Sequence, residues 1–347
     1  MAEPAAHAAP ALAAPTAPLV TVEAVRAAAS TLDGIAIRTP LVPFGRPADR
    51  RFLKAESLQP IGAFKIRGAY VAVASLSDDE RSRGVITYSS GNHAQGVARA
   101  ARLLGAPAVV VMPSDAPALK RARVEADGAE VVIVGTSSDE RKQVAEEIAV
   151  RRGLAIIPPF DDDRIIAGQG TVGLEIVEDL PDVVVVLVPI GGGGLASGVA
   201  VAVKALTPGA RVIGVESELA ADARDSLREG RIVRWPAELV SRTIADGTRT
   251  TGLGERTFAH LSALLDRIVT VTEDEIAAGV RLAAEESRLV VEPSGALPIA
   301  AMVFHAAELG LGPGSVTRGP VVAVVSGGNV DPDRYRSLLE VPIPSVG

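Results

Sequence analysis

Short apolar runs alternate with longer amphipathic segments along most of the 347-residue chain. Most runs are rich in valine and isoleucine and have the length of strands, which predicts strands at 51–54, 85–88, 108–112, 130–134, 154–157, 182–188, 211–215 and 321–325. The other segments predict helices at 21–30, 116–127, 138–152, 164–179, 273–288 and 295–309. Two more helices are expected after residues 89–93 and 191–194, ending at about 104 and at 206. Residues 217–270 are less regular. This alternation predicts a doubly wound α/β architecture.

The pattern also suggests how the chain is divided. Residues 85–158 hold four strand–helix units, and we expect them to form a small domain inserted in a large one made from residues 19–84 and 159–347. Residues 1–18 are rich in alanine and proline, without periodicity or a basic residue, and we expect a disordered tail.

Composition narrows the class of protein. The formal charge is −7, whereas proteins that bind nucleic acid or an acidic membrane carry an excess of positive charge, so we expect neither as a partner. The chain has no cysteine, which excludes disulfides, thiolate nucleophiles and zinc–thiolate sites. The longest apolar run, 183–190, is too short to span a membrane. We therefore expect a soluble, cytoplasmic protein of enzyme size.

Lys65 lies where a turn leads into a predicted helix. Pro60 and Gly62 indicate the turn. An ammonium between Phe64 and Ile66 loses hydration, which lowers its pKa and frees its lone pair to attack a carbonyl. The alternative is a lysine that reaches solvent from the helix start, the better interpretation for an isolated lysine.

A run of four glycines follows the valine-rich strand and precedes a helix. It comprises Gly191, Gly192, Gly193 and Gly194. Glycines let the backbone approach a phosphate closely, and successive N–H groups at a helix N-terminus bind its charge. The GxGxxG and GxxxxGK[ST] motifs are absent. We predict a phosphate-binding loop, with a close strand–helix crossing as the alternative.

Two further polar turns follow predicted strands. The first comprises Ser89, Ser90, Gly91, Asn92 and His93. Its hydroxyl, amide and N–H groups suit an anion such as a substrate carboxylate, although serine and asparagine are also ordinary helix N-caps. The second begins at Ser326, at the carboxyl end of the last strand, where α/β sheets bind ligands. Its hydroxyl suits a heterocyclic nitrogen, and a simple glycine-rich turn is the alternative.

Together these segments closely resemble the fold type II, or tryptophan-synthase-like, pyridoxal phosphate enzymes, and within them the threonine/serine dehydratase and serine racemase branch. The resemblance spans residues 21–332. Six motifs carry it in the family's order: GAFKIRGAY around Lys65, SSGNHAQG around Asn92, GGGG at 191–194, TIADG at 243–247, EPSGA at 292–296 and SGGN at 326–329. The resemblance implies two doubly wound α/β domains with the cofactor in the cleft between them.

The resemblance also implies roles for residues. Lys65 forms the Schiff base with pyridoxal 5'-phosphate and later removes the substrate Cα proton. Cofactor contacts fall to Phe64, Asn92, Gly191, Gly192, Gly193, Gly194, Leu195, Glu292 and Ser326. Substrate contacts fall to Ser89, Ser90, Gly91, Asn92 and His93. Ser90 matches the serine that acts opposite the lysine in the racemases, and Glu292 is alternatively a carboxylate at a helix start.

A divalent-cation site is implied at Glu216, the carbonyl of Ala220 and Asp222. Oxygen ligands of this kind suit Mg²⁺ or Ca²⁺. Ser217 and Glu218 depart from the branch's usual Pro-Ser, and a charged helix start at the surface is the alternative.

The reaction implied is loss of water from a β-hydroxy L-amino acid such as threonine or serine, which gives a 2-oxo acid and ammonia. A serine racemase with side dehydratase activity, or a dehydratase of 3-hydroxyaspartate or an aryl-serine, remains open. A catalytically inactive amino-acid or nucleotide-binding protein with the same fold is the alternative of another class.

Relatives commonly form dimers or tetramers, so we expect a homodimer or homotetramer. The chain ends about twenty residues after Ser326, and we expect no carboxyl-terminal regulatory domain.

Overall fold

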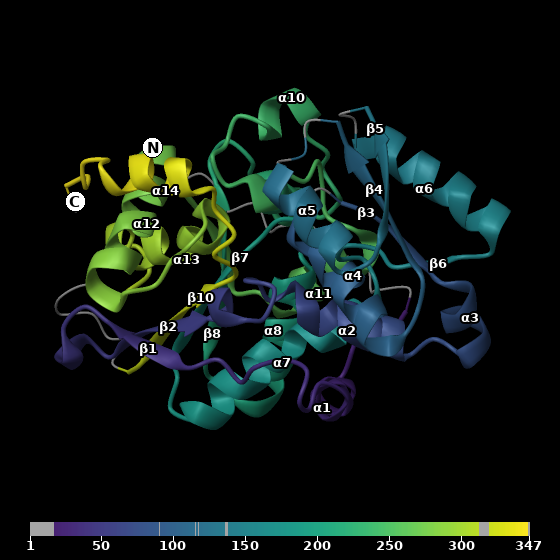
Figure 1. Ribbon diagram of the computed structural model, residues 1–347. Helices are drawn as coiled ribbons and strands as arrows, with labels where there is room; N and C mark the ends of the chain where they lie inside the picture. The colour runs from purple at the N-terminus through teal and green to yellow at the C-terminus, as the bar shows by residue number, and fades with distance from the viewer. Residues whose placement is uncertain are drawn as a thin grey trace, which may run out of the picture.

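The computed structural model describes residues 17–89, 91–114, 116, 118–135, 138–311 and 319–345. Within these ranges the strands form two sheets, a six-stranded one ordered β1-β2-β10-β7-β8-β9 and a four-stranded one ordered β5-β4-β3-β6. β1 pairs with β2 antiparallel, and the other strand pairs of the described chain are parallel. Figure 1 shows the four-stranded sheet to the right of the larger one. The expected α/β architecture with parallel sheets is confirmed.

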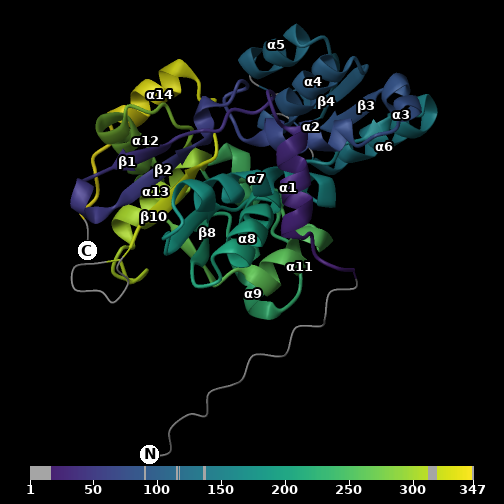
Figure 2. The same ribbon diagram turned by 90° about the horizontal axis from the view of Figure 1, so that it is seen from below.

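The larger sheet has helices on both faces. Its strands are β1 (Leu41–Phe44), β2 (Arg51–Ala55), β7 (Val185–Pro189), β8 (Arg211–Ser217), β9 (Arg267–Val271) and β10 (Val321–Val325). Alternate residues of β10 divide between two cores: Val321 packs with helices α12 (Glu273–Ser287) and α13 (Pro293–Phe304), and Val322 with α7 (Asp163–Asp179) and α8 (Gly194–Leu206). Figure 2 shows α7 and α8 beside each other, next to β8. Burial on both faces explains the valine-rich strands.

The smaller sheet is built from consecutive chain. Its strands are β3 (Val85–Tyr88), β4 (Ala108–Pro113), β5 (Glu130–Val134) and β6 (Ala155–Ile156), and its helices are α3 (Asp78–Arg83), α4 (Asn92–Leu104), α5 (Ala118–Ala126) and α6 (Ser138–Arg152). Val110 of β4 packs with α4, whereas Val111 packs with α6. Helix α2 (Lys65–Ala74) joins the core that contains α4, and its Arg67 bonds Glu175 of α7, so it lies between the two sheets.

The remaining elements are helices and 3₁₀ turns outside the two sheets. They are α1 (Val22–Thr31), α9 (Asp222–Glu229), α10 (Ala237–Val240), α11 (Glu255–Leu264), α14 (Pro332–Leu339) and the 3₁₀ turns η1 (Pro47–Asp49), η2 (Glu56–Leu58) and η3 (Asp246–Thr248). No helix of the described chain is long and apolar enough to cross a membrane.

The apolar pattern located the regular elements well. Strands β3, β5 and β10 and helix α6 have the predicted bounds, and most others differ by one to three residues. The irregular stretch 217–270 contains α9, α10, α11 and most of β9, and helices α3 and α14 were also missed. Helix α13 begins at Pro293 and ends at Phe304, five residues before the predicted end. Of the expected disordered tail, residues 1–18, residues 1–16 lie outside the described residues.

Candidate active site

Three of the predicted segments follow adjacent strands of the larger sheet. β10 lies between β2 and β7 and runs parallel to both, with Val325 opposite Ala55 and Ala323 opposite Leu187. The carboxyl ends of these strands therefore meet at one edge. The turn before Lys65 follows β2, the glycine loop (residues 191–194) follows β7, and Ser326 follows β10. Ligands of α/β sheets bind at such an edge.

Lys65 is the first residue of α2, and its amine is poorly hydrated. Its Nζ donates a hydrogen bond to the carbonyl of Pro159 at 2.6 Å and lies 5.2 Å from the centre of the Phe64 ring. The surrounding protein removes water from the ammonium and lowers the pKa of Lys65 to about 8. Near neutral pH, roughly one molecule in ten therefore carries the neutral amine.

The start of α2 is tied to the Ser326 turn by the backbone. The Phe64 N–H donates to the Ser326 carbonyl at 3.0 Å, and the Gly328 N–H donates to the Gly62 carbonyl at 2.9 Å. Ser326 itself is buried, with 4% of its surface exposed. These bonds fix the lysine turn and the end of β10 relative to each other.

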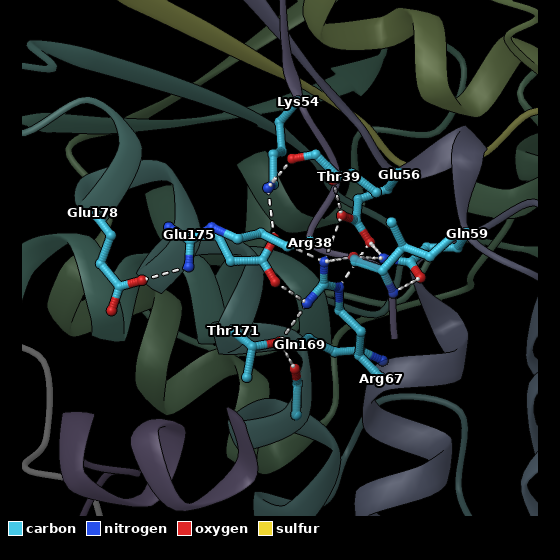
Figure 3. A network of polar contacts seen from close by, with 12 residues as sticks. Arg38, Thr39, Lys54, Glu56, Gln59, Arg67, Gln169, Thr171, Glu175 and Glu178 are labelled. Carbon is cyan, nitrogen blue, oxygen red and sulfur yellow. Dashed lines mark hydrogen bonds and ion pairs between the residues drawn. The ribbon is translucent and has the colours of Figure 1, made fainter. Parts of the chain in front are cut away.

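Behind Lys65, α2 is anchored by a buried ionic cluster (Figure 3). Arg67 donates to both carboxylate oxygens of Glu56 at 2.8 Å, and to Glu175 on α7 at 2.6 and 2.9 Å. Lys54 of β2 reaches the same Glu175 at 2.5 Å, so two cations face two carboxylates. A buried ion pair is weak evidence for stability, but separating its members would leave buried charges unpaired, so they hold one another in place. The cluster therefore fixes α2 to α7 and β2.

The glycine loop is packed too closely for side chains. A Cβ added to Gly192 would lie 2.1 Å from the Phe160 ring. Gly193, the N-cap of α8, has a φ of 92°, which only glycine adopts without strain. Leu195 is buried in the first turn of α8. The first N–H groups of a helix have no intrahelical partner, so this loop presents backbone donors to an anion.

Asn92 is held between two residues of the larger sheet's side of the site. Its Nδ2 donates to Glu292 Oε1 at 2.7 Å, and its Oδ1 accepts from Asn329 Nδ2 at 2.8 Å. Glu292 is the N-cap of α13 and only 3% exposed. Burial and the nearby charge of Asp246 raise the pKa of Glu292 to about 7.

The predicted substrate turn follows β3 and opens α4. The Ser89 hydroxyl accepts from the Gly91 N–H at 3.4 Å, and Gly91 is the N-cap of α4. Ser90 lies outside the described residues. His93 is buried, and burial together with the charge of Lys65 lowers its pKa to about 3. Because Nε2 bonds the Ile157 carbonyl at 3.1 Å, Nε2 carries the proton and Nδ1 is a buried acceptor without a partner in the described chain.

Further contacts close a ring around this edge. Pro159 holds the lysine, and the adjacent Phe160 packs on the glycine loop. On the other side of that loop, a Cβ on Gly191 would lie 3.0 Å from the Cα of Thr248. The neighbouring Gly247 N–H donates to the Ser294 hydroxyl at 2.8 Å, two residues after Glu292. The described residues predicted for cofactor and substrate thus surround one site.

The predicted cation residues lie elsewhere, at the end of β8 and the start of α9. Glu216, Ala220 and Asp222 are all buried. Glu216 accepts backbone N–H bonds from Ala223 and Arg224 at 3.0 and 2.8 Å, and Asp222 Oδ2 has no partner in the described chain. Burial raises the pKa of both carboxyls, that of Asp222 to about 7. No cluster of three or more acidic or histidine side chains that suits a metal is found in the described ranges.

The residues at the main site fit pyridoxal phosphate. An amine with a lowered pKa suits the cofactor's aldehyde, a side-chain-free glycine loop at a helix start suits its phosphate, and a buried hydroxyl and amide suit its ring. Three contacts at this site could not be predicted from the sequence. Pro159 and Phe160 were not predicted because they act through a carbonyl and a packed ring, and Lys120 because its partner, Asp246, is distant in sequence.

The chain is similar to known proteins over most of its length. A family model described as pyridoxal-phosphate dependent enzyme matches residues 32–327. An L-threo-3-hydroxyaspartate ammonia-lyase of Saccharomyces cerevisiae is 43% identical over 83% of this chain and 85% of its own length. An L-threonine ammonia-lyase of Thermotoga maritima is 42% identical over 90% of this chain and 76% of its own. The solved structure of maize serine racemase has a TM-score of 0.86, with 36% identity, over 92% of this chain and 97% of its own.

Proposed function

The chain belongs to the family of pyridoxal-phosphate dependent enzymes, and from this premise we propose that it is an ammonia-lyase acting on a β-hydroxy L-amino acid such as threonine or serine. The reaction removes water and yields a 2-oxo acid and ammonia. The observation that carries the proposal is the amine of Lys65, with a pKa of about 8, at the strand edge shared with the glycine loop. Relatives named as ammonia-lyases support the reaction class.

Each part of the cofactor has a partner in this chain. Lys65 Nζ would hold the aldehyde carbon, and the glycine loop with the Leu195 N–H would hold the phosphate. Asn92 would hold the ring hydroxyl and Ser326 the ring nitrogen, while Phe64 and Glu292 would line the site. When bound, pyridoxal phosphate supplies the sink for the electron pair released at the substrate Cα. A hydroxyl at the ring nitrogen, in place of a carboxylate, favours elimination over transamination.

The protein's own groups bind the substrate and move the proton. The N-terminus of α4, with Ser89, Gly91, Asn92 and His93, would bind the substrate carboxylate through backbone N–H groups. Because burial lowers the pKa of Lys65 to about 8, part of the protein carries the neutral amine near neutral pH, and this amine can accept the Cα proton. The Pro159 carbonyl accepts a hydrogen bond from the same amine and so orients it. Ser90 is proposed as the group acting on the opposite face.

A substrate panel tests the proposal. Purified protein loaded with the cofactor is incubated with L-threonine, L-serine, L-threo-3-hydroxyaspartate and an aryl-serine, and 2-oxo acid and ammonia are measured. We expect equal amounts of both products from at least one substrate, and none from the Lys65→Ala variant. A panel without any oxo acid would contradict the proposed function.

Racemisation of serine is the second candidate. The solved maize serine racemase has the same fold at 36% identity, and a serine stands at position 90. Chiral chromatography of serine after incubation separates the two activities. D-serine formed faster than pyruvate would favour the racemase, and its absence would exclude it.

We propose a divalent-cation site at Glu216, Ala220 and Asp222. Two buried carboxyls with raised pKa values, one with an unpartnered oxygen, suit Mg²⁺ or Ca²⁺, which bind oxygen ligands. A cation would stabilise the fold by binding the native state alone. Either ion should raise the melting temperature of the wild type and leave Asp222→Asn unchanged. Equal shifts in both proteins would contradict the site.

The domain division and the assembly are part of the same proposal. We propose that the cofactor lies between a small domain, residues 85–158, and a large one formed by residues 19–84 and 159–347. The two sheets support this division, since all four strands of the smaller sheet come from residues 85–156. The resemblance to the dehydratase branch supports a cytoplasmic homodimer or homotetramer. Light scattering of the purified protein measures its oligomeric state.

A further inference from the structure

Two cationic side chains of helix α5, which packs on the smaller sheet, bond residues that follow strands of the larger sheet. Lys120 Nζ bonds Asp246 Oδ2 at 2.8 Å, and their side chains are 16% and 29% exposed. Arg123, one helical turn later, donates to Asn329 Oδ1 at 2.5 Å. Asp246 opens η3, and Asn329 follows β10. Both contacts therefore join chain segments that belong to different sheets.

The partners of these cations are themselves part of the site's walls. Asn329 donates to Asn92, and η3 contains Thr248, which packs on the glycine loop. On the smaller sheet's side, Lys120 Nζ lies 3.9 Å from where a Cβ on Gly91 would be. The ammonium thus lies between η3 and residues 91–93, which open α4.

Charge makes Lys120 more than a packing residue. The charge of Asp246 favours protonation of Glu292, and the charge of Lys120 opposes it. Since Glu292 accepts the hydrogen bond of Asn92, the pair acts on the turn expected to bind the substrate carboxylate. Partly buried pairs are screened less by solvent and salt than exposed ones.

We propose that Lys120 is a positioning residue for this reaction: its ion pair with Asp246 holds residues 91–93 of the smaller sheet against η3, so that the substrate carboxylate is bound in reach of Lys65. The expected effect on KM rests on the proposed function. The contact itself is independent of that function.

Loss of the pair should weaken substrate binding more than the chemical step. We expect Lys120→Met and Asp246→Asn to raise KM for the preferred substrate about tenfold or more while kcat changes less than about threefold. The charge-exchanged double variant, Lys120→Asp with Asp246→Lys, should recover most of the lost affinity because it restores the pair. If neither single variant changes KM, or if the exchange restores nothing, the proposal is wrong.

The chain offers a matched control. Lys204 pairs with Asp266 at 2.7 Å, with side chains 21% and 33% exposed, so distance and burial resemble those of the proposed pair. This pair joins the last turn of α8 to the residue before β9, within the larger sheet. Lys204→Met should lower the melting temperature about as much as Lys120→Met but leave KM unchanged. An equal rise of KM in both would show a general loss of stability and overturn the proposal.

Hydrogen exchange of the loaded protein without substrate gives a readout independent of turnover. Peptides that contain residues 91–93 and 246–248 should exchange several-fold faster in Lys120→Met than in the wild type, and at the wild-type rate in Lys204→Met. Unchanged exchange of both peptides would overturn the positioning role. If the wild type acts on no amino acid, the proposed function fails, and this measurement still decides whether the pair holds the two segments together.

Discussion

At the scale of single residues, the site depends on groups whose surroundings change their ordinary chemistry. Lys65 loses hydration and gains a neutral fraction, while His93 is held neutral by burial and by that same lysine. Glycines 191–194 contribute by lacking side chains. These residues could be predicted as site residues because they lie in turns that come after predicted strands. Their protonation states could not, because these depend on neighbours distant along the chain.

Gly192→Ala should impair cofactor binding. The added Cβ would lie 2.1 Å from the Phe160 ring, so the ring or the loop must move. We expect at least about a tenfold weaker affinity for pyridoxal phosphate, a loss of about 1.4 kcal/mol, measured by absorbance titration of the apoprotein. Gly209→Ala is the control, because nothing lies within 4 Å of its Cβ position. Equal affinities of the two variants would argue against the loop as the phosphate site.

His93 should make the fold less stable in acid. Its pKa is lowered from 6.5 to about 3 in the folded state, so between these values the unfolded chain binds a proton that the native protein does not. Stability is therefore lost as pH falls through this window, by about 1.4 kcal/mol per pH unit from this group. Urea unfolding between pH 6.5 and 4.5 should show a shallower decline for His93→Gln, and parallel curves would refute the assignment.

At the scale of elements, α2 is held by the cluster around Arg67, and this explains how the amine that we propose to be catalytic is placed precisely at the first residue of a helix. The cluster draws on β2, η2 and α7, and both α2 and α7 are fixed by it (Figure 3). Apolar spacing predicts that α2 exists. The position of its first turn depends on carboxylates from other elements, which a pattern within the helix does not contain.

Arg67→Met should destabilise the protein strongly. It would leave Glu56, which is fully buried, and Glu175 without their main cation, which costs about 3–5 kcal/mol when a buried ion pair is broken. Arg121→Met, which removes an exposed helical pair with Glu125, should cost at most about 0.5 kcal/mol. Denaturant unfolding of both variants measures the difference, and similar losses would show that the cluster does not anchor α2.

Helices α9 and α11 were missed because little of what forms them is local in the sequence. In 217–270, α9 is short and mostly polar, and α11 begins where backbone N–H groups of Glu255, Arg256 and Thr257 bond the Asp161 carboxylate. That cap comes from 94 residues earlier in the chain. Helices whose ends are fixed by tertiary contacts leave little local signal.

At the scale of the whole molecule, the site exists only because two sheets and both halves of the chain meet. Strand order places β10 between β2 and β7, which brings the lysine turn and the glycine loop together although more than a hundred residues separate them. The sequence motifs predicted the lysine turn and the glycine loop as parts of a site, and the order of the motifs along the chain matched a known family. The contacts across the sheets, such as Lys120 with Asp246, required the fold.

The central claim is that Lys65 carries the cofactor. Borohydride reduction of the loaded protein, followed by proteolysis and mass spectrometry, tests it directly, because the chain has only five lysines: Lys54, Lys65, Lys120, Lys142 and Lys204. We predict that the pyridoxyl mass is found on the peptide containing Lys65 and on none of the other four. The mass on another lysine, or on none, would contradict the account.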